Sequence, residues 1–269
     1  MRILFGFSVI GITLLAIIVV FNAFRIRSFN PSTDLISLHY DHAPDKDDGQ
    51  STAADRTILQ SMFGIDWIKD HVVVVSGAYG KNADQFNTDS NSVMDAVWKE
   101  TGGWLSAHSN REMAFASLTD RWYRVLANGG HVWVKEGGQS DLTATVLKRI
   151  KERAPSLDTV QQIHVIQHSV WNERYTTEAA LAFTRKYTYY IKIRDGNEYL
   201  NREGGIDQFS KAAMEHPVYG KAWKAAFNYY KPEERLDISD TGALMYILGL
   251  GEIDLEEFLV RFLSEPTSG

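Results

Sequence analysis

Short runs of valine and isoleucine alternate with amphipathic helical patterns along most of this chain of 269 residues. Short apolar strands separated by helices are typical of βαβ units, whose strands run parallel in a sheet covered by helices. Strands are expected at 35–40, 71–76, 131–135, 163–167 and 189–193. Helices are expected at 51–69, 91–100, 111–127, 140–152, 176–186, 207–214, 220–229, 240–249 and 254–263. The sequence therefore predicts an α/β fold with a mostly parallel central sheet flanked by helices.

The N-terminus carries a separate apolar signal. The segment from Ile3 to Phe24 has no charged residue, with Arg2 before it and Arg25 and Arg27 after it. A helix of about 20 apolar residues spans the hydrocarbon core of a bilayer. A cleaved signal peptide usually has a shorter apolar region of about 7–15 residues that ends in small residues, and Phe21 is too bulky for such a site. We therefore predict an uncleaved transmembrane helix through residues 3–24, although the signal peptide stays open.

The predicted domain organisation follows from this segment. Residues 1–28 are expected to form an anchor or signal segment, and residues 29–269 a single α/β domain. The basic residues on the two sides of the apolar run balance, so the positive-inside rule does not set the orientation. A very short tail before the apolar run, followed by a large domain, favours export to the periplasm or the extracellular space.

Composition excludes several classes of function. The net charge is −6 and the chain has no run of Lys and Arg, which argues against a nucleic-acid partner. The chain has no cysteine, so disulfides, thiolate zinc sites and cysteine nucleophiles are excluded. Composition leaves the oligomeric state open.

A cluster of aspartates follows the first expected strand. Asp41, Asp45, Asp47 and Asp48 fall within eight residues, just before the helical pattern at 51–69. Carboxylates this close raise one another's pKa unless a cation neutralises them, and hard oxygen ligands suit Ca²⁺ or Mg²⁺. Ligands of open α/β sheets bind outside the carboxyl ends of the strands. The cluster therefore indicates a cation site, with a solvated acidic loop as the plain alternative.

Three more segments end a strand or open a helix. Glu136-Gly137-Gly138 follows one strand, and by itself it predicts only a turn before a helix. Polar residues and a tryptophan, from His168 to Glu173, follow the next strand, and they indicate either a recognition surface or a capped helix. Ser239 or Asp240 is suited to begin a late helix as its N-cap.

In their order and spacing, these four segments resemble the nucleoside hydrolase superfamily, especially its divergent nucleoside-hydrolase-like branch with an Asp-x-Asp-Asp element in the first loop. The resemblance covers residues 35 to about 250. It implies Asp41 as the first metal aspartate and as the catalytic base, with Asp47 and Asp48 as the adjacent pair. It also implies that the Glu136 carbonyl and Asp240 complete the metal shell.

The resemblance also implies substrate contacts. Asn172 lies six residues before Glu178-Ala179-Ala180, as an asparagine of the family does, and would contact a sugar hydroxyl. Asp47 would hydrogen-bond the sugar, or support the metal ligands from behind. His168, Trp171 and Tyr79 are candidates for recognition of the leaving group.

The chain departs from the family's pattern in three places. Ser239 stands where many members have a histidine that assists the leaving base. Gly77-Ala78 replaces a Gly-Asn ribose contact, and the loop from Asp41 to Asp48 is two residues longer than usual. These departures affect nucleoside specificity more than the metal site.

The resemblance implies a Ca²⁺-dependent hydrolase, with Mg²⁺ as a second option, that cleaves the N-glycosidic bond of a ribosylated or related nucleoside-like small molecule. Two alternatives stay open. One is a membrane-anchored protein of the same fold that binds metal and sugar but has lost catalysis. The other is a Mg²⁺-dependent phosphatase of the haloacid dehalogenase type, in which Asp45-Lys46-Asp47 serves as the Asp-x-Asp pair.

Overall fold

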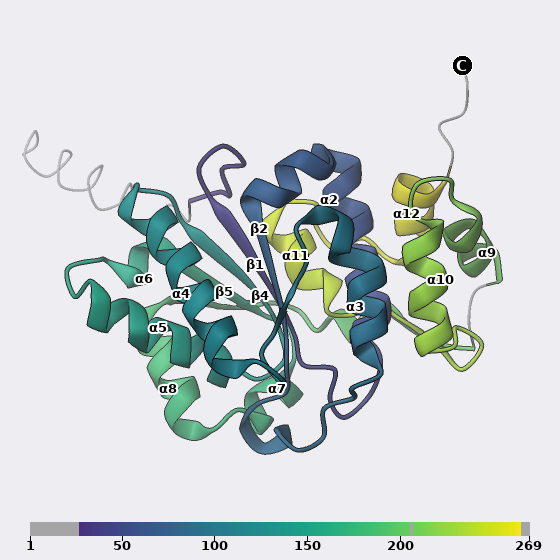
Figure 1. The fold of residues 1–269 in the computed structure, drawn as a ribbon. Coiled ribbons are helices and arrows are strands. Elements are labelled where there is room, and N and C mark those ends of the chain that lie inside the picture. Colours follow the sequence, from purple (N-terminus) through teal and green to yellow (C-terminus); the bar gives the residue numbers. More distant parts are fainter. Residues whose placement is uncertain (1–26, 205–206, 265–269) are drawn as a thin grey trace, which may run out of the picture.

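A six-stranded parallel sheet forms the centre of the computed structural model, which describes residues 27–204 and 207–264 (Figure 1). Its strands are β1 (Leu35–Tyr40), β2 (Val72–Ser76), β3 (Leu105–Ser106), β4 (Val132–Gly137), β5 (Ile163–Gln167) and β6 (Tyr189–Lys192). Their order is β3-β2-β1-β4-β5-β6, and every neighbouring pair is parallel. The prediction of an α/β fold with a parallel central sheet is confirmed.

Helices cover both faces of this sheet (Figure 1). The helices of the described residues are α2 (Asp48–His71), α3 (Ser90–Trp98), α4 (Arg111–Ala127), α5 (Asp141–Arg153), α6 (Thr159–Gln162), α7 (Val170–Tyr175), α8 (Glu178–Tyr187), α9 (Asp207–Glu215), α10 (Gly220–Tyr229), α11 (Thr241–Ile247) and α12 (Leu255–Phe258). Of these, α9, α10 and α12 lie at one side of the molecule, and α10 packs against α2 and α3 (Figure 1). Two short strands, β7 (Asn201–Glu203) and β8 (Arg235–Asp237), form a separate antiparallel pair. In the chain, β7 comes before α9 and β8 comes before α11.

Alternation along the strands divides the apolar core into two layers. Ile36 and Leu38 of β1 belong to one cluster, which includes buried residues of α2, α10 and α11. Leu35 belongs to the other, together with residues of α4 and α5 such as Trp122 and Leu147. Successive side chains of a strand point to opposite faces, so one strand contributes to both layers.

The elements missed by sequence reasoning are short. β3 has two residues and β7 and β8 have three each, too few for a periodic pattern. The expected helix at 51–69 begins earlier, at Asp48, and is interrupted at Gly64, where φ is +81°. The expected helix at 176–186 begins at Glu178, and α7 precedes it as a separate turn of helix.

The order of the strands creates a crevice between β1 and β4. From β1 the chain continues through β2 and β3 on one side, and it then crosses to β4 on the other side of β1. In doubly wound sheets, ligands bind at such a switch point, outside the carboxyl ends of the two diverging strands. Asp41 and Gly138 are the first residues after β1 and β4, and they therefore lie at this crevice.

The predicted transmembrane segment, residues 3–24, lies outside the described residues. Among residues 27–204 and 207–264, no helix has the length and apolar character needed to cross a membrane.

Candidate functional site

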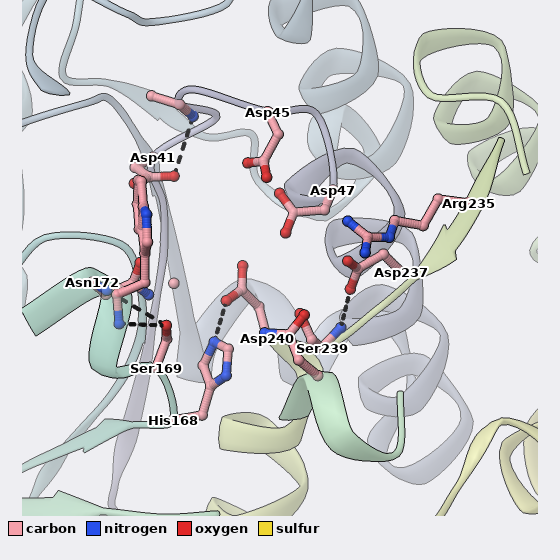
Figure 2. Close-up of a pocket in the computed structure, with 14 residues that line it drawn as sticks. Asp41, Asp45, Asp47, His168, Ser169, Asn172, Arg235, Asp237, Ser239 and Asp240 are labelled. Carbon is pink, nitrogen blue, oxygen red and sulfur yellow. Dashed lines mark hydrogen bonds and ion pairs between the residues drawn. The ribbon is translucent and has the colours of Figure 1, made fainter. Parts of the chain in front are cut away.

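A polar cavity of about 150 Å³ lies outside the carboxyl ends of β1 and β4 (Figure 2). Side chains from distant segments line it. They are Asp41, Ala43, Asp45, Asp47, Gly137, His168, Ser169, Trp171, Asn172, Asn197, Arg235, Asp237, Ser239 and Asp240. Figure 2 shows the carboxylates of Asp41, Asp45, Asp47 and Asp240 directed toward the same space. An acidic cavity therefore lies at the switch point of the sheet.

The first wall is the loop between β1 and α2. The Asp47 side chain accepts a hydrogen bond of 2.9 Å from the backbone N–H of Asp48 at the start of α2. Asp48 is buried and accepts from the backbone N–H of His42 at 2.5 Å. Because the loop folds back over its own carboxylate, Asp41 and Asp48 come together although seven positions separate them.

The glycines after β4 allow close approach of the second wall. A Cβ atom on Gly138 would lie 2.6 Å from the Cβ atom of Asp41, and one on Gly137 would lie 2.5 Å from the carbonyl oxygen of His39. Atoms of side chains do not tolerate such distances, so only glycine fits there. Gln139, the next residue, donates from Nε2 to Asp41 Oδ2.

The third wall is the loop from β8 to α11. Asp237 accepts a hydrogen bond of 3.0 Å from the backbone N–H of Ser239, which fixes the turn. Asp240 then begins α11 and pairs with His168 Nε2 at 2.6 Å. Lys135 Nζ of β4 lies 4.0 Å from Asp240 and 3.2 Å from the buried Asp55.

Three carboxyl groups face one another at the centre of this arrangement. The pKa of Asp48 responds to the charges of both Asp41 and Asp240. Burial, together with the charge of Asp240, raises the pKa of Asp41 to about 7. Burial and the charges of Asp240 and Asp41 raise the pKa of Asp48 well above its usual range. The cluster therefore holds more negative charge than its protein partners neutralise.

Two buried cations partly offset this charge. Burial alone would raise the pKa of Asp240, but Lys135 and His168 hold that pKa well below its usual value. Burial would lower the pKa of His168, but hydrogen bonds with Asp195 and Asp240 raise it to about 9. The charge of Asp48 also acts on Lys135. Among the described residues, however, Lys135 and His168 form ion pairs with Asp240 and not with Asp41 or Asp48.

The donor set suits a hard cation. Asp48 Oδ1 is buried and has no hydrogen-bond partner in the structure, and it lies among other carboxylate oxygens. An unpaired buried carboxylate oxygen is costly, and a divalent ion would satisfy it. In the described part of the chain, no three His, Asp or Glu side chains stand together in the geometry of a formed metal site.

A mixed polar and aromatic wall completes the cavity. The Asn172 amide donates to Gln167 Oε1 at 3.3 Å, and the hydroxyl of Ser169 accepts from the backbone N–H of Trp171 at 3.1 Å. The Trp171 ring stacks on Tyr175, with the ring centroids 4.1 Å apart. These contacts fix the position of a planar apolar side chain beside the acidic centre.

Most residues predicted from sequence meet here, and some do not. Asp41, Asp47, His168, Trp171, Asn172 and Asp240 all line the cavity. Asp48 lies just behind the surface. The Glu136 side chain turns to the opposite face of the sheet, where it binds Thr143, so its predicted role concerns only the carbonyl. Tyr79 does not line the cavity, and its hydroxyl binds the Ala107 carbonyl at 2.6 Å.

Sequence reasoning missed several residues of the site. Asp237 could have been predicted, because it lies three residues before Asp240 in the same acidic segment. Arg235 also lines the cavity, on the short strand β8 that showed no pattern. Lys135 gave only a weak signal, as a charged residue within an apolar strand, and it is fully buried.

A second polar cluster, called here the closed cluster, lies between the sheet and helices α4 and α5, and its side chains are buried. Ser37 Oγ lies 3.0 Å from His39 Nε2, and His39 Nδ1 lies 3.0 Å from Glu136 Oε1. This connectivity is that of a Ser-His-acid triad. All three side chains are buried and none lines the cavity, while Trp122 of α4 stacks on His39 and Thr143 of α5 binds Glu136. The cluster is therefore structural.

Comparison with protein-family models, with curated proteins and with solved structures found no match.

Proposed function

We propose that the chain is a Ca²⁺-dependent hydrolase of N-glycosidic bonds, acting on a ribosylated or related small molecule. The observation that carries this proposal is the meeting of Asp41 and Asp48 with Asp240, a residue from the other end of the domain. Such convergence places unneutralised carboxylates at the one edge of the sheet where α/β folds bind ligands. In a solvated acidic loop, the plain alternative, Asp41 and Asp48 would be exposed, whereas both are buried.

The metal would be held by the carboxylates of Asp41, Asp48 and Asp240, with the carbonyl of Glu136. When bound there, Ca²⁺ lowers the pKa of a coordinated water and holds the sugar diol, and Mg²⁺ is a second option. The buried, unpartnered Asp48 Oδ1 supports this assignment, as does the all-oxygen donor set.

The chain's own residues then have distinct roles. Asp41 accepts the proton of the attacking water, whose oxygen bonds to the anomeric carbon as the bond from that carbon to nitrogen breaks. The departing nitrogen takes a proton from solvent. Asp47 and Asn172 bind sugar hydroxyls, and Trp171 offers a flat apolar surface beside them. His168 keeps Asp240 in place through its hydrogen bond of 2.6 Å.

We also propose that residues 3–24 anchor the protein in a membrane and that the domain is exported. The support is the sequence alone, namely an uncharged apolar run bounded by arginines.

A second candidate function is the binding of metal and sugar without catalysis. One observation favours it. Ser239 stands where a leaving-group histidine would be expected, and the nearby His168 is already held by Asp195 and Asp240. In this alternative the cavity recognises a sugar, but no residue assists the departure of its leaving group.

The test is release of reducing sugar from a panel of nucleosides by the full chain in detergent, with Ca²⁺ or with a chelator. We expect release that requires Ca²⁺ and is lost in Asp41→Asn. The matched control is Asp66→Asn, because Asp66 is exposed in the last turns of α2, far from the cavity.

The other outcomes separate the alternatives. Binding of Ca²⁺ without sugar release from any nucleoside would favour the binding protein. Phosphate release from an aryl phosphate, lost in Asp45→Asn, would favour the phosphatase. Absence of divalent-ion binding would rule out the proposed mechanism.

A further inference from the structure

The chain is fixed onto the domain from Arg27 onward. The Arg27 guanidinium pairs with the buried carboxylate of Asp34 at 3.2 Å. Two residues later, the Phe29 ring makes edge-on contacts with Trp67 and Trp133, with centroid distances of 6.1 and 6.3 Å. The segment after Arg27 is therefore packed against the domain and does not act as a free linker.

This attachment point lies at the opposite end of the sheet from the cavity. Asp34 comes just before β1, whereas Asp41 of the cavity comes just after it. A strand of six residues is about 20 Å long. In Figure 1 the beginning of β1 and the carboxyl end of α2 lie at one end of the molecule, and α7 lies at the other.

The distance from this point to the predicted membrane segment is short. Only Arg25 and Ile26 stand between Phe24, the last residue of the apolar run, and Arg27. Three steps of the chain reach at most about 10 Å. If residues 3–24 span a bilayer, the part of the domain around Arg27 must lie at its surface.

Several exposed apolar and aromatic residues at this end have the matching chemistry. Tyr246 is 39% exposed and shares a hollow with Arg27 and Phe29. Tyr189, at the start of β6, is 39% exposed, and Val160, just before β5, is 40% exposed. Tyrosine, tryptophan and arginine are the residues that favour the interface between water and lipid.

We propose that this surface, made by Arg27, Phe29, Val160, Tyr189 and Tyr246 and called here the anchor end, rests on the headgroup region of a lipid bilayer. The acidic cavity then opens away from the membrane, about 20 Å farther into the aqueous space. Substrate reaches it from solution and not from the lipid phase. The surface belongs to the domain itself and acts together with residues 3–24.

The absence of cysteine allows a direct test, because one introduced cysteine carries a unique fluorescent label. The full chain is reconstituted into phosphatidylcholine vesicles with or without phosphatidylcholine that bears a spin label on its headgroup. Labels are placed at the anchor end by Tyr189→Cys and, separately, Tyr246→Cys. Matched labels at the cavity end are placed by Met113→Cys and Val170→Cys, which are 60% and 56% exposed.

We expect the headgroup spin label to quench both anchor-end labels several-fold more than both cavity-end labels. Equal quenching at the two ends, or stronger quenching at the cavity end, overturns the proposal. Anchor-end labels that are shielded from aqueous iodide but not quenched by lipid overturn it too, because another protein chain would then cover the surface. The two labels at each end, with circular dichroism of each variant, guard against loss of fold at one position.

Discussion

Strand β1 carries a buried aspartate just beyond each of its ends, and the two have opposite surroundings. Asp34 accepts five hydrogen bonds or ion-pair contacts, each between 2.9 and 3.2 Å. Their donors are Arg27, Asn30, Thr33, His131 and Trp133. Asp41 accepts from Gln139 and Ala43 but faces the carboxyl groups of Asp48 and Asp240.

The two aspartates differ in whether the protein itself stabilises the charge of the carboxylate. Donors that surround Asp34 stabilise its charge within the protein, so no external group is needed. Carboxylates that surround Asp41 raise the free energy of the charged site, which a bound cation would lower. Burial alone does not distinguish the two, because both side chains are less than a tenth exposed.

The largest effect on folding is expected from Asp34→Ala. It leaves the backbone N–H groups of Asn30 and His131 and the Trp133 indole N–H without an acceptor. We expect the free energy of unfolding to fall by about 3–5 kcal/mol, as when one partner of a buried pair is removed. Urea denaturation measures this loss. Ca²⁺ affinity per folded molecule should stay unchanged, and a loss of affinity would break the comparison.

Asp48→Asn should have the opposite profile. The amide oxygen of asparagine can still accept from the backbone N–H of His42, so the fold is retained. We expect Ca²⁺ affinity to fall at least about 100-fold, which corresponds to about 2.8 kcal/mol. Isothermal titration calorimetry measures this change. Unaltered affinity would remove Asp48 from the metal shell.

The two ends of the sheet were not equally open to prediction from sequence. Asp41, Asp47, Asp48 and Asp240 could be selected because each stands at a strand end or helix start. Asp34 stands in the same kind of position, but the sequence around it does not indicate that five donors surround its carboxylate. Its partners His131 and Trp133 are about a hundred residues away, and the register of β1 against β4 brings them close.

The sheet itself was predictable, because Val and Ile runs separated by amphipathic helices admit few other folds. The short strands β3, β7 and β8 were not, because two or three residues show no period. The surroundings of the Lys135 and Glu136 side chains were also not predictable from the sequence. Adjacent residues of a strand point to opposite faces, so Lys135 lies beneath the cavity and the Glu136 side chain lies in the closed cluster.

Acid should lower the free energy of unfolding through His164, whose ring contacts Tyr189 of the anchor end. Burial, and then the charge of His131, lower the pKa of His164 to about 4. In the unfolded chain this histidine binds a proton near pH 6.5, so the unfolded state gains protons first as the pH falls. The stabilisation that neutral His164 provides is fully present above pH 6.5 and is lost as the pH falls toward 4. Between pH 7.5 and 5, the free energy of unfolding should fall by about 2 kcal/mol. His164→Gln should lose this part of the pH dependence in denaturation curves, and an unchanged curve would contradict the assignment.

The smallest effect is expected in the closed cluster. Thr143→Val keeps the shape of the side chain but removes the hydroxyl that donates to Glu136 at 2.7 Å. We expect a loss of about 1 kcal/mol in the free energy of unfolding, the net worth of one such bond. Sugar release and Ca²⁺ affinity should not change. A large loss of activity would show that this cluster is coupled to the cavity.

A crystal structure of the protein soaked in Ca²⁺ tests most directly whether the facing carboxylates form a cation site. We predict one ion bound to carboxylate oxygens of Asp41, Asp48 and Asp240 at about 2.3–2.6 Å. An ion-free cavity at millimolar Ca²⁺, with the three carboxyl groups in the positions they have without the ion, would contradict it.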